Sequence, residues 1–339
     1  MSFRAFLVTK EENNFFRNVV DRQLSDLPDD EVLIDVKYSS LNYKDGLSAT
    51  GNPRVTRIFP HTPGLDASGV VLESRDKDFT PGDEVIVIGF DLGMGTSGGF
   101  AERICVPGGW VVKMPHGLTM HRSMLLGTAG FTAAECIDKL ERSGMTTESG
   151  PVLVTGSTGG VGSVAIKLLS HIGYDAVAVT GKVDQHDFLR KLGAKEVISR
   201  EDMLDGKDKP LLPEKWGGVI DTVGGDILFN AVKSLKYGEG LAACGLVASP
   251  QFSATVLPFI LRNVNLLGID SVQLPVGEKK LIWEKLGSDW NVDLGDLEVP
   301  FKLDTLSSGI DRILAGEMVG RGVVNLEDQK LENKIFDTA

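Results

Sequence analysis

Four glycines near the middle of the chain, at positions 156, 159, 160 and 162, carry the clearest chemical signal in the sequence. The apolar residues 152–154 precede them and are typical of a buried parallel strand. Apolar residues then recur from Val161 at offsets of 3, 4, 7, 8 and 11, which is one face of an amphipathic helix. Glycines let a backbone approach phosphates and a helix N-terminus offers free N–H groups, so this order predicts a dinucleotide site. A structural tight turn is the alternative, because Ser157 stands where the first glycine of G-x-G-x-x-G would be.

The end of the second predicted strand indicates which nucleotide binds. In NAD-binding folds an acidic residue stands there and holds the ribose hydroxyls. This sequence has Thr180, Gly181 and Lys182 instead, so no carboxylate would repel a 2′-phosphate and the lysine can pair with it. Arg200, just past the third predicted strand, could reach the same place. We therefore expect NADPH as the cofactor; the alternative is that the lysine is solvated and Asp184 takes the acidic role.

The elements that would position these residues fall into two regions. Residues 1–125 contain short alternating strands such as 31–42, which predict a β-rich, barrel-like catalytic domain. Residues 126–296 alternate strands with helices, and their six predicted strands are the count of a doubly wound, parallel Rossmann sheet of the α/β class. Residues 297–339 read as a helix and a strand that we expect to return to the first domain, with the active site in the cleft between the domains.

The composition excludes several classes of protein. The formal net charge of −12 argues against binding to nucleic acid or to a membrane surface, both of which favour a basic protein. No apolar run reaches the length of a membrane span, and the first residues do not read as a signal peptide. The three cysteines are odd in number and far apart, which is typical of reduced thiols in a cytoplasmic protein.

A set of motifs occurs in order along the chain and covers most of it. PGDEV (81–85) and GGFAE (98–102) are general, whereas LNYKD (41–45) together with PFILRNVNLLGIDS (258–271) is narrower. On these motifs the sequence resembles the medium-chain dehydrogenase/reductase superfamily, its zinc-independent quinone oxidoreductase branch and, within it, the acryloyl-CoA reductase group. Further matching stretches are SSLNYKD (39–45), PGLDASG (63–69), GTAGFTA (127–133), VTGSTGGVG (154–162), IDTVG (220–224) and AACG (242–245).

The resemblance implies a fold, an assembly and a set of cofactor contacts. It implies a GroES-like catalytic domain beside the Rossmann domain, and usually a homodimer in which the last Rossmann strand, Asn263 to Asp270, pairs with its partner's copy. Such pairing would protect an apolar edge strand. On composition alone, Leu246 and Ile260 are ordinary core residues. The cofactor contacts that the resemblance implies are Ser157, Thr158, Gly159, Gly160, Val161, Leu246, Ile260 and Ser271.

Zinc alcohol dehydrogenases share this architecture and are the nearest alternative. They hold zinc through a Cys, a His-Glu pair and a further Cys, but here Asn42 stands in the first place and Leu65-Asp66 in the second. Three cysteines cannot form a four-sulfur site, and none of the five histidines begins an H-E-x-x-H cluster, so we predict no metal. Short-chain reductases are set aside because no tyrosine has a lysine four positions later.

The residues of the LNYKD motif are the first candidates for the chemistry. Tyr43 can donate a hydrogen bond to a developing oxyanion, to the cofactor or to a bridging water, or it can pack against the cofactor without proton transfer. Asn42 can take part in catalysis or only cap a turn. Arg262 and Arg321 are the cationic candidates, and each could touch an anionic cofactor or a CoA phosphate, or pair with a carboxylate at a domain interface.

Three functions remain open at this point. The leading hypothesis is an NADPH-dependent acryloyl-CoA reductase, in which hydride reaches the β-carbon of the thioester and the resulting enolate is protonated at the α-carbon. The second is a quinone or general enone reductase on the same scaffold, since nothing in the sequence fixes the acceptor. The third is a catalytically silent relative that binds NADPH and reduces nothing, although the intact LNYKD segment argues against it.

Overall fold

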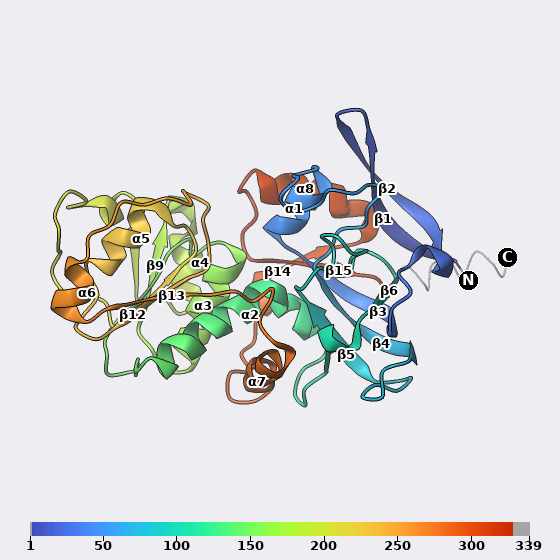
Figure 1. Ribbon diagram of the computed structural model, residues 1–339. Coiled ribbons are helices and arrows are strands. Elements are labelled where there is room, and N and C mark those ends of the chain that lie inside the picture. Colours follow the sequence, from blue (N-terminus) through green and yellow to red (C-terminus); the bar gives the residue numbers. More distant parts are fainter. Residues whose placement is uncertain (1, 328–339) are drawn as a thin grey trace. The chain divides into compact units, whose positions relative to one another are not determined.

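The computed structural model describes residues 2–327 and falls into two compact units (Figure 1). The first unit is built from residues 2–128, 272–287 and 294–327, and the second from residues 129–271 and 288–293. The division lies within helix α2 (Met120–Arg142), beside Gly127, whose φ of 52° and ψ of −160° interrupt the helix. Within residues 2–327, no helix combines the length and the apolar character that crossing a membrane requires.

The second unit contains a parallel sheet of six strands in the order β10-β9-β8-β11-β12-β13. This is the 3-2-1-4-5-6 order of a complete dinucleotide-binding sheet, so the predicted fold class is confirmed. The central strands are apolar on both faces, as expected for strands that are covered on both sides. The strands are β8 (Val152–Val154), β9 (Ala176–Thr180), β10 (Glu196–Ser199), β11 (Gly218–Asp221), β12 (Gly240–Ala243) and β13 (Asn265–Gly268).

Four further helices belong to the second unit: α3 (Gly160–His171), α4 (His186–Lys191), α5 (Gly225–Val232) and α6 (Leu257–Arg262). The sequence of residues 184–194 predicts one helix with Asp184 as its N-cap and Gly193 as its stop, but the observed helix is shorter. A 3-10 turn comes first, and Gln185 rather than Asp184 is the N-cap of α4, so the predicted cap is wrong. Gly193 follows the helix with a φ of 110°, the left-handed conformation that a helix stop needs.

The first unit is β-rich and is organised around a seven-stranded sheet. Its path is β14-β15-β3-β4-β5-β7, and β6 pairs with β3. Strand β15 pairs with β3, so the tail of the chain belongs to this unit; residues 328–339 lie outside the described residues. The strands are β1 (Ser2–Glu11), β2 (Asn14–Gln23), β3 (Val32–Leu41), β4 (Asp66–Ser74), β5 (Glu84–Ile88), β6 (Arg103–Val106), β7 (Val111–Lys113), β14 (Glu298–Phe301) and β15 (Arg321–Asn325).

Three helices complete the first unit: α1 (Tyr43–Ala49), α7 (Val276–Gly287) and α8 (Leu306–Leu314). Helices α1 and α8 pack closely, because Gly46 leaves room for the Leu314 side chain (Figure 1). Helix α7 falls in the sequence region assigned to the nucleotide-binding domain, yet it groups with the first unit. The buried Lys279 explains this, because its Nζ donates to the carbonyl of Ile88 at 2.7 Å.

Candidate active site

The glycine loop lies at the carboxyl ends of the parallel strands, directly after β8. Gly156 has a φ of 61°, and a Cβ there would lie only 2.2 Å from the Thr222 hydroxyl oxygen. A Cβ on Gly162 would lie 2.5 Å from the Gly156 carbonyl oxygen. Both positions therefore require glycine, and they allow the loop to turn tightly from β8 into α3.

Ser157, which stands in place of a glycine, holds the loop through its side chain, and its predicted contact with the cofactor stays a prediction. Its buried Oγ donates to the Val154 carbonyl at 2.7 Å and accepts the Val179 N–H at 2.9 Å, so it ties β8 to β9. Thr158 is also buried, at 7% exposure. The expected ligand contacts of Gly160 and Val161 would use N–H groups of the first turn of α3, which an α-helix leaves free, whereas the Gly159 N–H donates to the Gly156 carbonyl at 3.0 Å.

The residues predicted to select NADPH come together at the same edge of the sheet. Thr180, Gly181 and Lys182 follow β9, and Arg200 follows β10. The Arg200 guanidinium packs on the glycine, because a Cβ on Gly181 would lie 3.2 Å from its Cζ. The Arg200 N–H also donates to the Thr180 carbonyl at 3.1 Å. Asp184, the alternative acidic residue, is exposed and its carboxylate accepts a side-chain amide from the next residue.

Leu246 and Ile260 are not core residues. Their exposed fractions are 64% and 69%, so the alternative based on composition is wrong, while their predicted contact with the cofactor stays a prediction. Ser271 is 7% exposed and its hydroxyl lies 2.7 Å from that of Thr132.

Arg262 does not lie with the other predicted cofactor contacts. Its Nη1 and Nη2 donate to the carbonyls of Lys233 and Leu212, each at 2.7 Å, and its Nε lies 3.3 Å from Glu214. These partners precede β12 and β11, so they mark the amino ends of the strands, opposite the glycine loop. The prediction that Arg262 contacts the cofactor is therefore wrong, because α6 ends at the wrong edge of the sheet.

A carboxylate that the sequence analysis did not select ties the loops of this edge together. Asp221, at the end of β11, is fully buried and accepts the Thr155 hydroxyl on Oδ1 and the Gly224 N–H on Oδ2, each at 2.7 Å. Its carbonyl accepts the Cys244 N–H at 2.9 Å. Burial raises the pKa of the Asp221 carboxyl, and the two hydrogen bonds to it oppose that shift. The IDTVG motif contained this residue, but sequence spacing did not show that it joins three loops.

The first unit contains a buried polar cluster at the start of α1. The side-chain amide of Asn42, the N-cap of α1, donates to Asp66 Oδ2 at 2.8 Å. Arg321, at the start of β15, is 2% exposed; it donates from Nε to the Leu125 carbonyl at 3.1 Å and from Nη1 to Asn42 Oδ1 at 3.3 Å. Both predicted residues are therefore buried, and their polar groups bond within the first unit, while their role in the reaction stays a prediction.

Two carboxylates complete this cluster, which comprises Asn42, Asp45, Asp66 and Arg321. Asp45 accepts the backbone N–H of Asn42 at 2.8 Å and, on its other oxygen, the N–H groups of residues 64 and 65 at 3.1 and 2.9 Å. Burial, then the neighbouring Asp66, raise the pKa of Asp45 to about 7. The Asp66 carboxylate also accepts the hydroxyl groups of Ser40 and Thr128.

The guanidinium of this cluster is confined by its surroundings. Burial lowers the pKa of Arg321, and the carboxylates of Asp66 and Asp45 raise it. A side chain on Gly127 could not be accommodated, because its Cβ would lie 2.6 Å from Arg321 Nη2. Among the described residues, Nη2 has no hydrogen-bond partner. The cluster is therefore a fixed, internal arrangement of charge that holds the first turn of α1.

Tyr43 is the exposed member of the LNYKD motif. It is the first residue of α1 and is 50% exposed, whereas its neighbour Asn42 is buried. This exposure fits either role considered above, donation to a ligand or packing against a cofactor.

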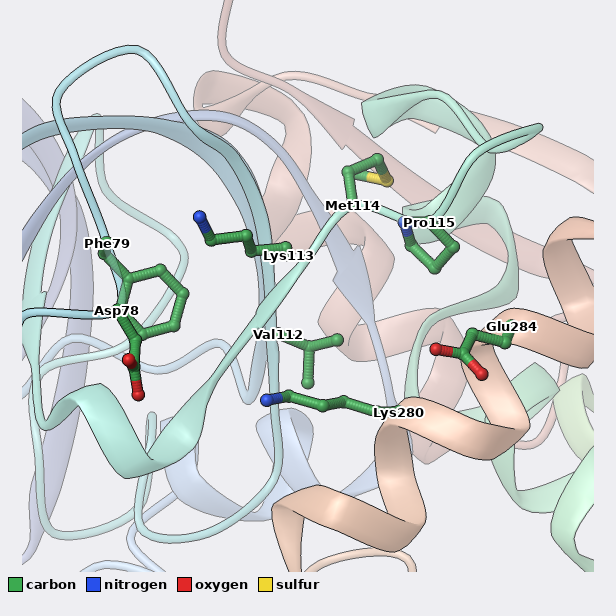
Figure 2. A pocket seen from close by; sticks show the side chains of 8 residues that line it. All are labelled: Asp78, Phe79, Val112, Lys113, Met114, Pro115, Lys280 and Glu284. Carbon is green, nitrogen blue, oxygen red and sulfur yellow. The ribbon is translucent and has the colours of Figure 1, made fainter.

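A separate surface cavity of about 290 Å³ lies between β7 and α7 in the first unit (Figure 2). Figure 2 shows the apolar side chains of Val112, Met114 and Pro115 in this cavity, with Lys280 and Glu284 reaching over it from α7. Its rim carries two lysines and two acidic residues, so its charges favour neither an anionic nor a cationic ligand. None of the residues that line it belongs to the candidate site.

Within the described residues, no group of three or more His, Cys, Asp or Glu side chains could hold a metal ion. The position where zinc enzymes place their first ligands is occupied here by Asn42 and Asp66, with the Arg321 guanidinium against them. A buried cation at this place would repel a divalent metal ion.

Comparison with known proteins identifies the family. The model of the alcohol dehydrogenase GroES-like domain matches residues 28–116, and the model of the zinc-binding dehydrogenase domain matches residues 160–284. The chain belongs to the medium-chain dehydrogenase/reductase superfamily, and the predicted resemblance is confirmed.

Individual relatives cover nearly the whole chain. A putative quinone oxidoreductase, YhfP of Bacillus subtilis, is 43% identical over 96% of this chain and 99% of its own length, and its NAD-bound crystal structure superposes with a TM-score of 0.94. An acrylyl-CoA reductase, AcuI of Ruegeria pomeroyi, is 42% identical over 96% of this chain and 99% of its own. The YhdH oxidoreductase of Salmonella enterica, crystallised with NADP, is 38% identical over 96% of this chain and 100% of its own, with a TM-score of 0.91.

Proposed function

We propose that this protein is an NADPH-dependent reductase of the C=C bond of an α,β-unsaturated acyl-CoA, with acryloyl-CoA as substrate and propionyl-CoA as product. The observation that carries the cofactor choice is the corner at residues 180–182, where Arg200 packs on Gly181 and no acidic residue ends β9. The acceptor is supported by the full-length similarity to an acrylyl-CoA reductase.

Each unit has its own part in the reaction. Bound NADPH supplies the hydride that reaches the β-carbon, and the α-carbon takes a proton to complete the saturated thioester. In the second unit, the glycine loop and the start of α3 hold the pyrophosphate, and Lys182 and Arg200 hold the 2′-phosphate. In the first unit, the exposed Tyr43 contacts the reacting groups or the cofactor.

Asn42 and Arg321 are positioning residues in this proposal. Both are buried, and each hydrogen-bonds within the polar cluster, so they act through the first turn of α1. The cluster fixes the helix that begins with Tyr43, and it does so with protein charges alone. We therefore propose that the reaction proceeds without zinc, which suits the reduction of an already activated C=C bond.

We also propose a homodimer formed through β13. This strand is at the edge of the six-stranded sheet, and Leu266 on it is 38% exposed. Unpaired backbone groups on an apolar edge strand favour pairing with a second copy. Gel filtration with light scattering tests this proposal, and a monomer at micromolar concentration would contradict it.

NADPH oxidation with acryloyl-CoA, crotonyl-CoA and a benzoquinone tests the function. We expect the highest kcat/KM with acryloyl-CoA and NADPH. A higher kcat/KM with benzoquinone would favour the quinone reductase, which the similarity to YhfP supports, and turnover of none of the three would indicate a silent nucleotide-binding protein. Tyr43→Phe separates the roles of that residue, because an unchanged kcat would leave only packing.

A further inference from the structure

A surface loop of the first unit, residues 50–65, carries positive charge in an acidic protein. The chain has 47 acidic residues among 339, about one in seven, yet the whole run from Gly46 to Leu65 contains none. It contains two arginines, Arg54 and Arg57, and both are exposed. The loop therefore carries positive charge in a protein whose formal net charge is −12.

The loop is anchored to α1 at both ends. After α1 ends, the Asn52 N–H donates to the Leu47 carbonyl at 3.0 Å. At the far end of the loop, the N–H groups of residues 64 and 65 donate to Asp45 in the first turn of α1. In between, the Thr56 hydroxyl lies 2.7 Å from that of Ser48. The arginines are thus held at a fixed place relative to the helix that begins with Tyr43.

The two guanidinium groups are not used for internal ion pairs. Within residues 2–327, neither Arg54 nor Arg57 lies within ion-pair distance of a carboxylate; Arg57 only donates from Nε to the Pro53 carbonyl at 3.2 Å. Eight other arginines do pair with carboxylates, at positions 4, 17, 22, 75, 103, 142, 190 and 262. Beside Arg57, Ile58 is 78% exposed and offers an apolar surface.

The acidic residue on the neighbouring turn, Asp91, forms no ion pair with the arginines. The Thr56 hydroxyl also donates to the Met94 carbonyl at 2.9 Å, which brings the turn at residues 91–96 against the loop. Asp91 on that turn uses its carboxylate within the turn, accepting the Gly95 N–H at 3.2 Å and the Thr96 hydroxyl at 3.1 Å. Among the described residues, neither Asp91 nor another carboxylate forms an ion pair with the two guanidinium groups.

We propose that Arg54 and Arg57 bind the phosphate groups of the CoA nucleotide of the substrate; this inference rests on the proposed function. CoA carries a diphosphate and a 3′-phosphate at one end, a long uncharged pantetheine arm, and the thioester at the other end. The exposed Tyr43 begins α1 and the arginines follow its other end, and a helix of seven residues spans about 10 Å. The loop therefore places the phosphates away from the reacting carbon, and Ile58 offers its apolar surface to the adenine ring or the arm.

The test compares a substrate that has the nucleotide with one that lacks it. The double variant Arg54→Gln/Arg57→Gln is assayed with acryloyl-CoA, acryloyl-pantetheine and benzoquinone. We expect kcat/KM for acryloyl-CoA to fall by about tenfold, mainly through KM, because two exposed charge-assisted contacts are lost. The values for acryloyl-pantetheine, benzoquinone and NADPH should stay unchanged. Arg312→Gln, an exposed arginine of α8 in the same unit, is the matched control and should behave as wild type.

Binding of adenosine 3′,5′-bisphosphate, measured calorimetrically with NADP⁺ saturating the cofactor site, provides a second readout. We expect binding to the wild type and its loss in the double variant. Equal losses with acryloyl-CoA and acryloyl-pantetheine, or no loss with either, would overturn the inference and leave the proposed function standing. Wild-type protein that reduces neither thioester would instead refute the proposed function, and the inference with it.

Discussion

Replacing Asp221 by asparagine should weaken NADPH binding without touching the cofactor directly. The carboxylate accepts two hydrogen bonds, from the Thr155 hydroxyl and the Gly224 N–H, each at 2.7 Å. An asparagine offers one oxygen and one NH₂ group, so only one of these donors can be accepted. If the amide oxygen of the asparagine accepts the Thr155 hydroxyl, the NH₂ group of the asparagine faces the Gly224 N–H. Two hydrogen-bond donors then face each other at a fully buried position.

The cost follows from these contacts. Losing a charge-assisted hydrogen bond and leaving a buried donor unpaired costs about 3 kcal/mol. Burial disfavours the Asp221 charge, as its raised pKa shows, so removal of that charge offsets part of the cost. We expect a net loss of about 2 kcal/mol, which lowers Tm by about 4–8 °C for a unit of this size.

The displaced loops should bind the cofactor less well. Thr155 directly precedes the glycine loop, so we expect the Kd for NADPH, measured by fluorescence titration, to rise by about tenfold while kcat at saturating NADPH is retained. Asp226→Asn, on the exposed first turn of α5, is the matched control and should cost less than 1 kcal/mol. In a double-mutant cycle, Asp221→Asn and Thr155→Val should couple by about 1 kcal/mol. An Asp221→Asn variant with wild-type Kd and Tm would refute this reasoning.

Three further predictions concern charged residues of the two units. Arg321→Leu leaves Asp45 and Asp66 buried without their cation, so urea denaturation should show an unfolding free energy lower by about 3–5 kcal/mol. A decrease below about 1 kcal/mol would contradict the view that Arg321 balances these two carboxylates. The Asp45 pKa of about 7 lies above its unfolded value of 3.8, so this group's contribution to the unfolding free energy is complete below 3.8 and lost as the pH rises through 7. In Asp45→Asn, the unfolding free energy should therefore fall less steeply as the pH rises from 3.8 to about 7. The same slope in the variant and the wild type would show that another group is responsible for the fall. Arg200→Glu should raise KM for NADPH by about tenfold or more and leave KM for NADH nearly unchanged; equal changes would remove Arg200 from the 2′-phosphate site.

Local patterns of the sequence were enough to predict the fold of the second unit. Each strand and the glycine turn can be predicted from a short segment of sequence. The rules of parallel sheets then bring residues 180–182 and Arg200 to one edge of the sheet. Arg262 shows the error that arises when these rules are not applied. The residue directly precedes β13, so the same rules place it at the amino ends of the parallel strands, opposite the glycine loop. The prediction followed the motif and not the direction of the strand.

The polar cluster of the first unit shows a second limit. Arg321 lies far from Asp45 and Asp66 in the sequence and meets them because β15 pairs with β3, which no local pattern predicts. Asn42 and Arg321 were identified from the sequence, but the burial that makes them positioning residues was not. Direction and burial of a polar side chain follow from the packing of distant segments, so a motif can name a residue without giving its role.

Two kinds of arginine in the described residues bear on the proposed function, and they differ in what surrounds them. Arg321 is buried with the carboxylates of Asp45 and Asp66, and its positive charge balances their negative charge. Arg200, Arg54 and Arg57 are exposed, and in an acidic protein an exposed arginine that no carboxylate engages attracts anions. The first of these lies at the nucleotide edge and the other two on the loop that follows α1, so in our proposals each unit binds one phosphate-bearing ligand. An acyl-CoA reductase needs both sites, one for the cofactor and one for the substrate, whereas a quinone reductase needs only the first.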